Sequence, residues 1–507
     1  MPPHAVAALE DCEIGTIRQV DVEGEPVLLF RDGDGVHAVS GICPHAGAPL
    51  IEGLQHGNRI VCPWHKATFC LRTGALLEPP AVDSLQRYDV RIETGRVMLS
   101  PSEETREQPA ADSRCFVIAG GGAAGAVAAQ TLRQEGFGGR IVMLDRENRV
   151  PYDRTTLSKY FLSGEQGSEK SPLQSQSFYR QHRIERKTAE IARVDAAERR
   201  IVCADGSVFN YDAALLATGA APKRPLIAGA DKAFLLRNRA DADAILARAE
   251  RSERAVVLGA SFIGMEVAAS LRERGLDVTV VAQAKAPFEK QLGARIGGVF
   301  TRLHESRGVQ FRLGQEIAAL RDGGVVLKSG EKLQADLVVA GFGVTPATDY
   351  LTGIDRNEDG GITVDATLQA GAGLFAAGDI ARFPLRGDGK PIRVEHWRVA
   401  EQHGRVAALN MLGRGVRYDA VPVFWTIQYL KRLDYIGHAT DWDDIVVHGD
   451  LEKPEFLAYY VKNNQVLAAV GLDRDRDTAA LIELFQAKRQ WTPDALGPDP
   501  ASLLDKN

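Results

Sequence analysis

The chain has few cysteines, and their positions exclude two common architectures. Only six occur among 507 residues, and none forms a Cys-x-x-Cys pair, so their spacing gives no disulfide framework. No cysteine follows Cys203, which excludes a second cysteine-ligated iron–sulfur cluster in the rest of the chain. We therefore expect a protein of a reducing compartment and predict a cytoplasmic location.

A strong charge of one sign and long apolar runs are absent as well. The formal net charge is −6, so no broad basic surface indicates binding to nucleic acid. No run of 18 apolar residues occurs, and the N-terminus lacks a basic stretch followed by an apolar one. These absences argue against a membrane span and a signal peptide. With 25% charged residues the composition is that of ordinary globular domains, and 507 residues allow three or four of them.

Two short loops each offer one thiolate and one imidazole. They read Cys43-Pro-His45 and Cys62-Pro-Trp-His65. A Rieske [2Fe–2S] centre needs this donor set, because two histidines replace two cysteines on one of its irons. A structural zinc site is the alternative, although zinc fingers usually present a cysteine pair before a histidine pair. The loops resemble those of Rieske ferredoxins, which often have glycine after the second histidine. Lys66 stands there instead, and we expect its side chain to point into water.

Changes of pattern along the chain predict a multidomain protein. Residues 1–100 alternate short apolar runs with turn residues, which indicates an all-β domain, and the polar residues 101–113 indicate a linker. From residue 114 onward strands alternate with longer helical segments, as in parallel α/β units. We expect two nucleotide-binding modules, one at 114–232 together with 345–415 and one at 233–344. Residues 416–507 are expected to form a small α+β domain.

The first glycine-rich turn follows an apolar strand. It reads Gly120-Gly-Gly122-Ala-Ala124-Gly125, and an alanine-rich helix follows it. Glycine at the first, third and sixth positions allows a tight turn, close approach of a diphosphate, and close packing of helix on strand. Asp145 lies twenty residues after Gly125, where a carboxylate binds a ribose hydroxyl. This turn therefore predicts a dinucleotide site.

A second turn of the same kind reads Gly259-Ala-Ser261-Phe-Ile263-Gly264. Ser261 replaces the middle glycine, so a diphosphate fits there more tightly than it would against glycine. The next strand ends at Ala282, where an NAD enzyme is expected to place Asp or Glu for the adenosine ribose. No acidic residue stands at that position, so the sequence does not exclude NADPH.

Residues 114–507 resemble the two-dinucleotide flavoprotein reductases, and in particular their ferredoxin-reductase and apoptosis-inducing-factor-like branch. Five segments carry the resemblance in the family's order: PYDRTTLSK at 151–159, ATG at 217–219, FAAGD at 375–379, EHW at 395–397 and FWT at 424–426. Thr155 and Thr156 replace two prolines of the first segment. The resemblance implies that 114–232 with 345–415 binds FAD and that 233–344 binds NADH.

The resemblance also assigns roles to individual residues. Beyond the two glycine-rich turns, it implies cofactor contacts from Arg154, Lys159, Ala217, Thr218, Gly219, Glu266, Gly343, Asp379, Glu395, His396, Trp397 and Trp425. It further implies catalytic roles for four of these, with a carboxylate–ammonium pair beside the flavin: Lys159, Glu266, His396 and Trp425. A simple surface carboxylate is the alternative for Glu266.

These features together predict an NAD(P)H-dependent reductase with a fused Rieske domain. A nicotinamide delivers two electrons as a hydride, whereas a [2Fe–2S] cluster accepts them singly, and a flavin can do both. We therefore expect electrons to pass from NAD(P)H through FAD to the Rieske cluster, and then to an external acceptor protein such as an oxygenase. The alternative is a redox-responsive signalling protein of the apoptosis-inducing-factor-like kind, with slow NADH oxidation. The oligomeric state stays open, a homodimer included.

Overall fold

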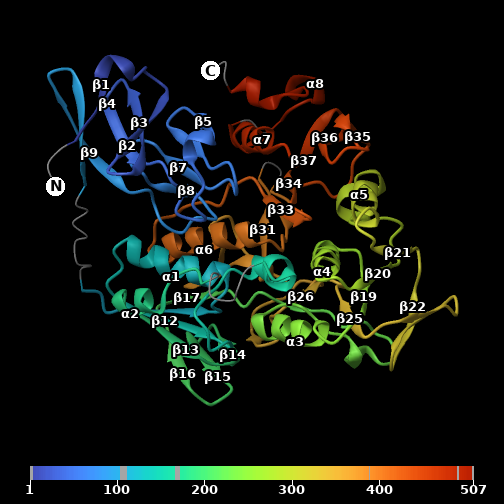
Figure 1. Ribbon diagram of the computed structural model, residues 1–507. Helices are drawn as coiled ribbons and strands as arrows, with labels where there is room; N and C mark the ends of the chain where they lie inside the picture. The colour runs from blue at the N-terminus through green and yellow to red at the C-terminus, as the bar shows by residue number, and fades with distance from the viewer. Residues whose placement is uncertain (1–3, 103–110, 166–171, 387–388, 488–489, 505–507) are drawn as a thin grey trace.

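The computed structural model describes residues 4–102, 111–165, 172–386, 389–487 and 490–504. Most of the linker expected at 101–113 therefore lies outside the described residues. Figure 1 shows four parts packed together: an N-terminal domain in blue, two α/β modules, and a C-terminal domain in orange and red.

Two antiparallel sheets form the N-terminal domain. In the larger sheet the Asp32 carboxylate accepts a hydrogen bond from the N–H of Asp34 and so closes the turn between β3 and β4. This sheet has the order β1-β10-β9-β4-β3-β2, with β1 (His4–Ala8), β2 (Ile17–Val22), β3 (Glu25–Asp32), β4 (Gly35–Ser40), β9 (Arg87–Glu93) and β10 (Arg96–Pro101). The smaller sheet has the order β5-β6-β7-β8, with β5 (Leu54–His56), β6 (Arg59–Val61), β7 (Thr68–Cys70) and β8 (Leu76–Glu78).

The first α/β module is built on one sheet drawn from two distant stretches of chain. Its strand order is β13-β12-β11-β17-β30-β29, with β11 (Cys115–Ala119), β12 (Arg140–Asp145), β13 (Ile184–Thr188), β17 (Ala213–Leu216), β29 (Gln369–Gly371) and β30 (Leu374–Ala376). The helices are α1 (Ala123–Gln134), α2 (Gln176–Gln181) and α6 (Trp397–Met411). A Cβ at Gly404 of α6 would lie 2.2 Å from the carbonyl oxygen of Ala124, so glycine lets α6 pack directly on α1.

Smaller sheets complete this module. One has the order β16-β15-β14-β27, with β14 (Ile191–Asp195), β15 (Arg200–Cys203), β16 (Val208–Asn210) and β27 (Leu351–Thr352). Another has the order β28-β31-β32, with β28 (Ile362–Thr363), β31 (Ala381–Pro384) and β32 (Pro391–Ile392). The two chain crossings into and out of the second module pair with each other as β18 (Ala220–Pro222) and β26 (Val344–Pro346).

The second α/β module repeats the architecture on a smaller scale. Its parallel sheet has the order β21-β20-β19-β25, with β19 (Arg254–Leu258), β20 (Asp277–Ala282), β21 (Gln310–Leu313) and β25 (Leu337–Ala340). The helices are α3 (Arg239–Ala249), α4 (Phe262–Glu273) and α5 (Glu289–Glu305). An antiparallel sheet follows α5 along the chain, with β22 (Ile317–Arg321), β23 (Gly324–Leu327) and β24 (Lys332–Gln334).

The C-terminal domain packs against the N-terminal domain as well as against the second module. Its sheet has the order β33-β34-β37-β36-β35, with β33 (Val423–Gln428), β34 (Lys431–Gly437), β35 (Asp444–Asp450), β36 (Glu455–Lys462) and β37 (Gln465–Leu472), followed by α7 (Asp475–Ala487) and α8 (Pro493–Leu496). Leu54 and Val61 of the N-terminal domain belong to the apolar core of this sheet and of α7. The chain thus has the expected fold class. Among the described residues no helix is long and apolar enough to cross a membrane.

Candidate functional site

Two loops of the N-terminal domain, after β4 and after β6, bring four candidate metal ligands together. The rings of His45 and His65 meet edge to face with centroids 4.7 Å apart, and the buried thiols of Cys43 and Cys62 lie close enough for each to shift the pKa of the other. Burial lowers the pKa of both histidines, that of His65 to about 2, so both imidazoles are neutral. Within the described part of the chain, both Nδ1 atoms are buried without a hydrogen-bond partner. A pair of thiols and a pair of neutral, unpartnered imidazoles fit a [2Fe–2S] cluster with one pair on each iron.

This arrangement in pairs does not suit a single zinc ion. A structural zinc takes four ligands around one point. The donor set therefore favours the binuclear cluster over the zinc alternative.

The environment of Lys66 differs from the expectation. Its side chain is only 1% exposed, and its Nζ lies 2.6 Å from Oδ1 of Asp475 and 2.8 Å from the carbonyl oxygen of Pro63. The prediction that Lys66 points into water is wrong, because the C-terminal domain covers the loop and supplies an acidic partner.

The first glycine-rich turn has the shape of a dinucleotide site. Gly120 has φ +118°, and a Cβ there would lie 2.2 Å from the carbonyl oxygen of Ala217. A Cβ at Gly125 would lie 1.9 Å from the carbonyl oxygen of Gly120, whereas one at Gly122 would meet no protein atom of the described residues within 4 Å. The helix α1 begins at Ala123, next to Ala124, and no side chain of the described residues caps its N-terminus. The N–H groups of this first turn are therefore free to bind an anion. These residues fit the diphosphate of FAD.

Asp145 reaches the same turn from the end of β12. A Cβ at Gly121 would lie 2.3 Å from Oδ2 of Asp145, so the carboxylate packs directly against the backbone of the turn. Burial raises the pKa of Asp145, while the nearby guanidinium of Arg154 opposes that shift. Arg154 itself forms an ion pair with Glu147 at 2.7 Å.

The second turn is equally tight. Gly259 has φ +102° and a Cβ there would lie 2.5 Å from the carbonyl oxygen of Gly341, while a Cβ at Gly264 would lie 2.2 Å from that of Gly259. The hydroxyl of Ser261 donates to the same Gly341 carbonyl at 2.9 Å, and no described side chain caps α4. Ile263 in the first turn of α4 is 44% exposed. The turn thus leaves a second helix N-terminus free for a diphosphate.

The segment at Ala217 joins the first module to a late part of the chain. The hydroxyl of Thr218 donates to the carbonyl oxygen of Ala347 at 2.7 Å. Gly219 has φ +67°, and a Cβ there would lie 3.0 Å from a guanidinium nitrogen of Arg237. Arg237 forms an ion pair with Asp379 at 2.7 Å.

Three further predicted residues have local partners. Gly343, with φ +82°, lies between β25 and β26, and its carbonyl accepts from the N–H of Lys223. Glu395 forms an ion pair with Arg393. The indole of Trp397 donates to Oε1 of Glu401 at 2.9 Å.

The Lys159–Glu266 pair is assembled in a buried site. Lys159 lies on a π-helical turn, Leu157–Phe161, a local irregularity that often marks functional sites. Its Nζ is 2.9 Å from Oε2 of Glu266, which is 3% exposed. Oε2 also accepts a hydrogen bond from Ser158, and Oε1 accepts one from the hydroxyl of Thr426 at 2.7 Å. Glu266 is therefore not a surface carboxylate.

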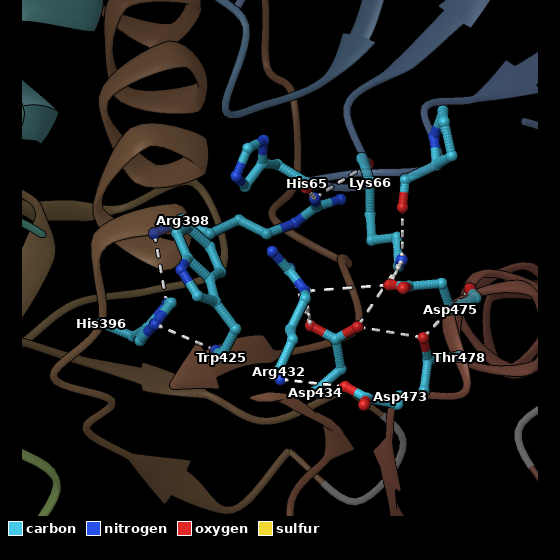
Figure 2. A network of polar contacts seen from close by, with 11 residues as sticks. His65, Lys66, His396, Arg398, Trp425, Arg432, Asp434, Asp473, Asp475 and Thr478 are labelled. Atoms are coloured by element: carbon cyan, nitrogen blue, oxygen red, sulfur yellow. Dashed lines mark hydrogen bonds and ion pairs between the residues drawn. The ribbon is translucent and has the colours of Figure 1, made fainter. Parts of the chain in front are cut away.

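Trp425 lies between His65 of the metal-ligand loop and His396, a residue for which the resemblance implies a cofactor contact (Figure 2). Its ring centroid is 6.3 Å from that of His65 and 4.8 Å from that of His396. Burial lowers the pKa of His396 to about 3, so its imidazole is neutral, and its two ring nitrogens face the backbone N–H groups of Arg398 and Trp425. This contact brings together residues that the sequence separates by more than 300 positions.

Sequence reasoning missed the residues that join the domains. Arg398, 1% exposed, donates from Nη1 to the carbonyl oxygens of Lys66 at 2.9 Å and His65 at 3.3 Å. Arg432 binds Asp434 at 2.7 Å, and its guanidinium lies 5.3 Å from the centre of the Trp425 ring. The one signal for Arg398 was a charged residue directly before the apolar Val399 and Ala400, which are buried with it in the first turn of α6.

Family models match the chain in three consecutive parts. Residues 3–89 match the Rieske [2Fe-2S] domain, residues 114–404 the pyridine nucleotide-disulphide oxidoreductase family, and residues 423–506 the reductase C-terminal domain. The chain is similar over most of its length to apoptosis-inducing factor 3 of Mus musculus, with 37% identity across 96% of this chain and 84% of that protein.

Two further relatives match a smaller share of this chain. The ferredoxin–NAD(+) reductase component of the anthranilate 1,2-dioxygenase system of Burkholderia cepacia is 34% identical over 77% of this chain and 97% of its own. The structure of the covalent putidaredoxin reductase–putidaredoxin complex matches with a TM-score of 0.73 and 27% identity, over 78% of this chain and 99% of that one.

Proposed function

The chain belongs to the pyridine nucleotide-disulphide oxidoreductase family and carries a Rieske domain and a reductase C-terminal domain, and on this premise we propose that it moves electrons from NAD(P)H to its own Rieske cluster. It is an FAD-dependent oxidoreductase, with a [2Fe–2S] cluster and a nicotinamide substrate. The onward acceptor is an external protein such as an oxygenase. Supporting this, one relative is named as the reductase component of a dioxygenase system.

The chemistry of FAD, the nicotinamide and the [2Fe–2S] cluster determines which binding sites the protein must provide. FAD accepts two electrons as a hydride and releases them singly, which matches a one-electron cluster to a two-electron donor. Cys43, His45, Cys62 and His65 would hold the cluster. The turns at Gly120 and Gly259 would hold the two dinucleotides, with Asp145 on a ribose hydroxyl.

The remaining residues bind, orient and balance charge. Glu266 holds the ammonium of Lys159 in place inside a site where water is largely excluded. The ion pair of Arg237 keeps the carboxylate of Asp379 fixed beside Gly219, two residues for which the resemblance implies contacts with the cofactor. His396 is held neutral by burial and therefore adds no charge beside the flavin.

One observation carries the proposal: the ring of Trp425 contacts both His65 and His396 within a single chain (Figure 2). A candidate cluster ligand and a residue for which the resemblance implies a cofactor contact therefore lie on either side of one aromatic residue, which supports the proposal.

Anaerobic titration with NADH, and separately with NADPH, tests the function. Absorbance reports on the flavin and electron paramagnetic resonance on the cluster. We expect a Rieske-type signal to grow as the flavin bleaches, with NADH the better donor. Bleaching of the flavin beside an intact, dithionite-reducible cluster that stays oxidised would contradict the proposal.

A second candidate is a redox-responsive signalling protein with slow NADH oxidation. The match to a protein named apoptosis-inducing factor 3 favours it, because that match includes the Rieske domain. A change of oligomeric state on adding NADH, together with slow reoxidation of the cluster, would support this function; fast turnover with an acceptor protein would support the reductase. A homodimer and a cytoplasmic location stay predictions.

A further inference from the structure

The loop that carries His65 has an unusual residue at its tightest position. The two ligand loops share one pattern of backbone hydrogen bonds. In each loop the N–H of the cysteine donates to the carbonyl oxygen five residues later, and the carbonyl of the cysteine accepts from the N–H four residues later. The fourth residue has a positive φ in each loop, +81° at Gly47 and +63° at Lys66. A left-handed backbone suits glycine and strains lysine. A lysine at this position indicates that its side chain contributes something that glycine cannot.

The side chain of Lys66 leaves its own domain. Apart from the carbonyl of Pro63, its Nζ faces two carboxylates of the C-terminal domain: Asp475 at 2.6 Å and Asp434 at 3.6 Å. Asp434 lies on β34 and Asp475 begins α7. Because Lys66 is 1% exposed, this charge is compensated across the domain boundary and not by water.

The carboxylate of Asp434 extends the contact toward Trp425 (Figure 2). Asp434 is 3% exposed and accepts from the hydroxyl of Thr478 at 3.0 Å as well as from Arg432. Burial alone would raise the pKa of Asp434, but Arg432 and Lys66 hold it below its usual value, so the carboxylate stays charged. The guanidinium of Arg432 then lies against the ring of Trp425. A continuous set of charged groups therefore runs from the His65 loop to the aromatic residue beside it.

We propose that Lys66 is a positioning residue: its ion pairs with Asp434 and Asp475 hold the His65 loop against Trp425 of the same chain. The inference rests on the proposed function, which needs the cluster close to the flavin. It adds that ion pairs within the folded chain keep the His65 loop next to Trp425, so that the two domains do not have to diffuse together before each electron transfer.

Two variants remove the ion pair from opposite sides. Lys66→Gly deletes the cation and leaves the backbone of the loop unstrained, as Gly47 does in the other loop. Asp475→Asn neutralises the partner at a side chain that is 51% exposed, where a neutral amide is tolerated. Arg72→Ala is the matched control, because Arg72 forms its ion pairs with Asp32 and Asp34 inside the N-terminal domain.

Two readouts on the holoenzyme decide the role of Lys66. Hydrogen–deuterium exchange reports on the amides of 62–68 and 431–437, and anaerobic rapid mixing with NADH reports on flavin and cluster separately. Lys66→Gly removes a buried cation and leaves the buried carboxylate of Asp434 with one partner fewer, so we expect cluster reduction to slow about tenfold or more in this variant. The slowing should be smaller in Asp475→Asn, because Asp475 is half exposed and Asp434 still faces the cation. Amide exchange in both segments should rise, while the rate of flavin bleaching and the spectrum of the dithionite-reduced cluster stay as in the wild type. Arg72→Ala should change neither readout.

Wild-type exchange and wild-type cluster reduction in both Lys66→Gly and Asp475→Asn would overturn the inference. If the wild-type flavin bleaches without any reduction of the cluster, the proposed function fails instead. The amide exchange of the variants then decides by itself whether Lys66 holds the loop in place.

Discussion

The carboxylate of Glu266 accepts hydrogen bonds from two other parts of the chain. Lys159 and Ser158 reach it from the π-helical turn, and Thr426 reaches it from β33. A carboxylate accepts all of these bonds, whereas an amide in its place would present N–H donors to groups that also donate.

Glu266→Gln should therefore lower stability and slow reduction of the flavin. Lys159, with its side chain 10% exposed, would keep a buried charge without its partner, which costs roughly 3–5 kcal/mol in comparable buried pairs. Rapid mixing with NADH measures flavin reduction, and denaturant unfolding measures stability. Glu273→Gln, at the exposed C-terminal end of the same helix, is the control. A variant as stable and as fast as this control would refute the role given to Glu266.

His304 makes stability depend on pH. Burial lowers its pKa to about 4, against about 6.5 for an exposed histidine, and its Nε2 is 2.7 Å from Oε1 of Gln428. Between these two values the unfolded chain binds a proton that the folded protein does not, so stability falls as the pH drops from about 6.5 to about 4. Denaturant midpoints at pH 7 and pH 5 measure the loss, which should be smaller in His304→Gln. Equal losses in variant and wild type would show that His304 does not contribute.

Single residues could be predicted from the sequence where a chemical requirement fixed their type and spacing. The ligand loops were visible because a Rieske cluster needs two thiolates and two imidazoles. Lys66 was misjudged because a lone lysine beside a ligand has no local feature that distinguishes burial from exposure. Its acidic partners lie more than 360 positions away.

Among the elements, the two strand–turn–helix units are the predicted sites of the two dinucleotides. In the first turn, Gly125 and Gly122 serve different purposes. A Cβ at Gly125 would overlap the carbonyl oxygen of Gly120, whereas a Cβ at Gly122 would point into space open to a ligand.

Alanine at these two glycines should give opposite phenotypes. Gly125→Ala must push α1 off β11, so the protein should lose stability with and without FAD. Gly122→Ala should leave the stability of the apoprotein unchanged and weaken FAD binding, because its methyl group takes the place of a diphosphate oxygen. The flavin content of purified protein and the Tm of the apoprotein distinguish the two. FAD bound as tightly by Gly122→Ala as by the wild type would place the diphosphate elsewhere.

Regular elements were predictable wherever apolar periodicity and glycine position agreed, as in β11, α1 and β20. The π-helical turn at Lys159 was not, because it results from packing of 157–161 against α4 and not from a local preference. Ser261 was expected only to narrow the second turn. Its bond to the carbonyl of Gly341 shows that it also fixes the crossing that follows β25.

For the whole molecule, the main result is that the N-terminal domain packs against the C-terminal domain and α6 of the same chain. The sequence left open whether the Rieske domain meets its own flavin or that of a neighbouring chain. Leu54 and Val61 share a core with the C-terminal domain, and Arg398 binds the carbonyls of the His65 loop. Side-chain contacts between residues that are hundreds of positions apart depend on the shapes of the folded domains. Neither the composition of the sequence nor its hydrophobic periodicity predicts them.

Electron transfer within one chain is the central claim, and its kinetic order tests it most directly. The rate of cluster reduction after anaerobic mixing with excess NADH should be measured over a wide range of protein concentration. Because Trp425 connects the two sites inside one molecule, we predict a first-order rate constant that does not change with protein concentration. A rate that rises in proportion to protein concentration would show that the cluster receives its electrons from another chain and would contradict the account.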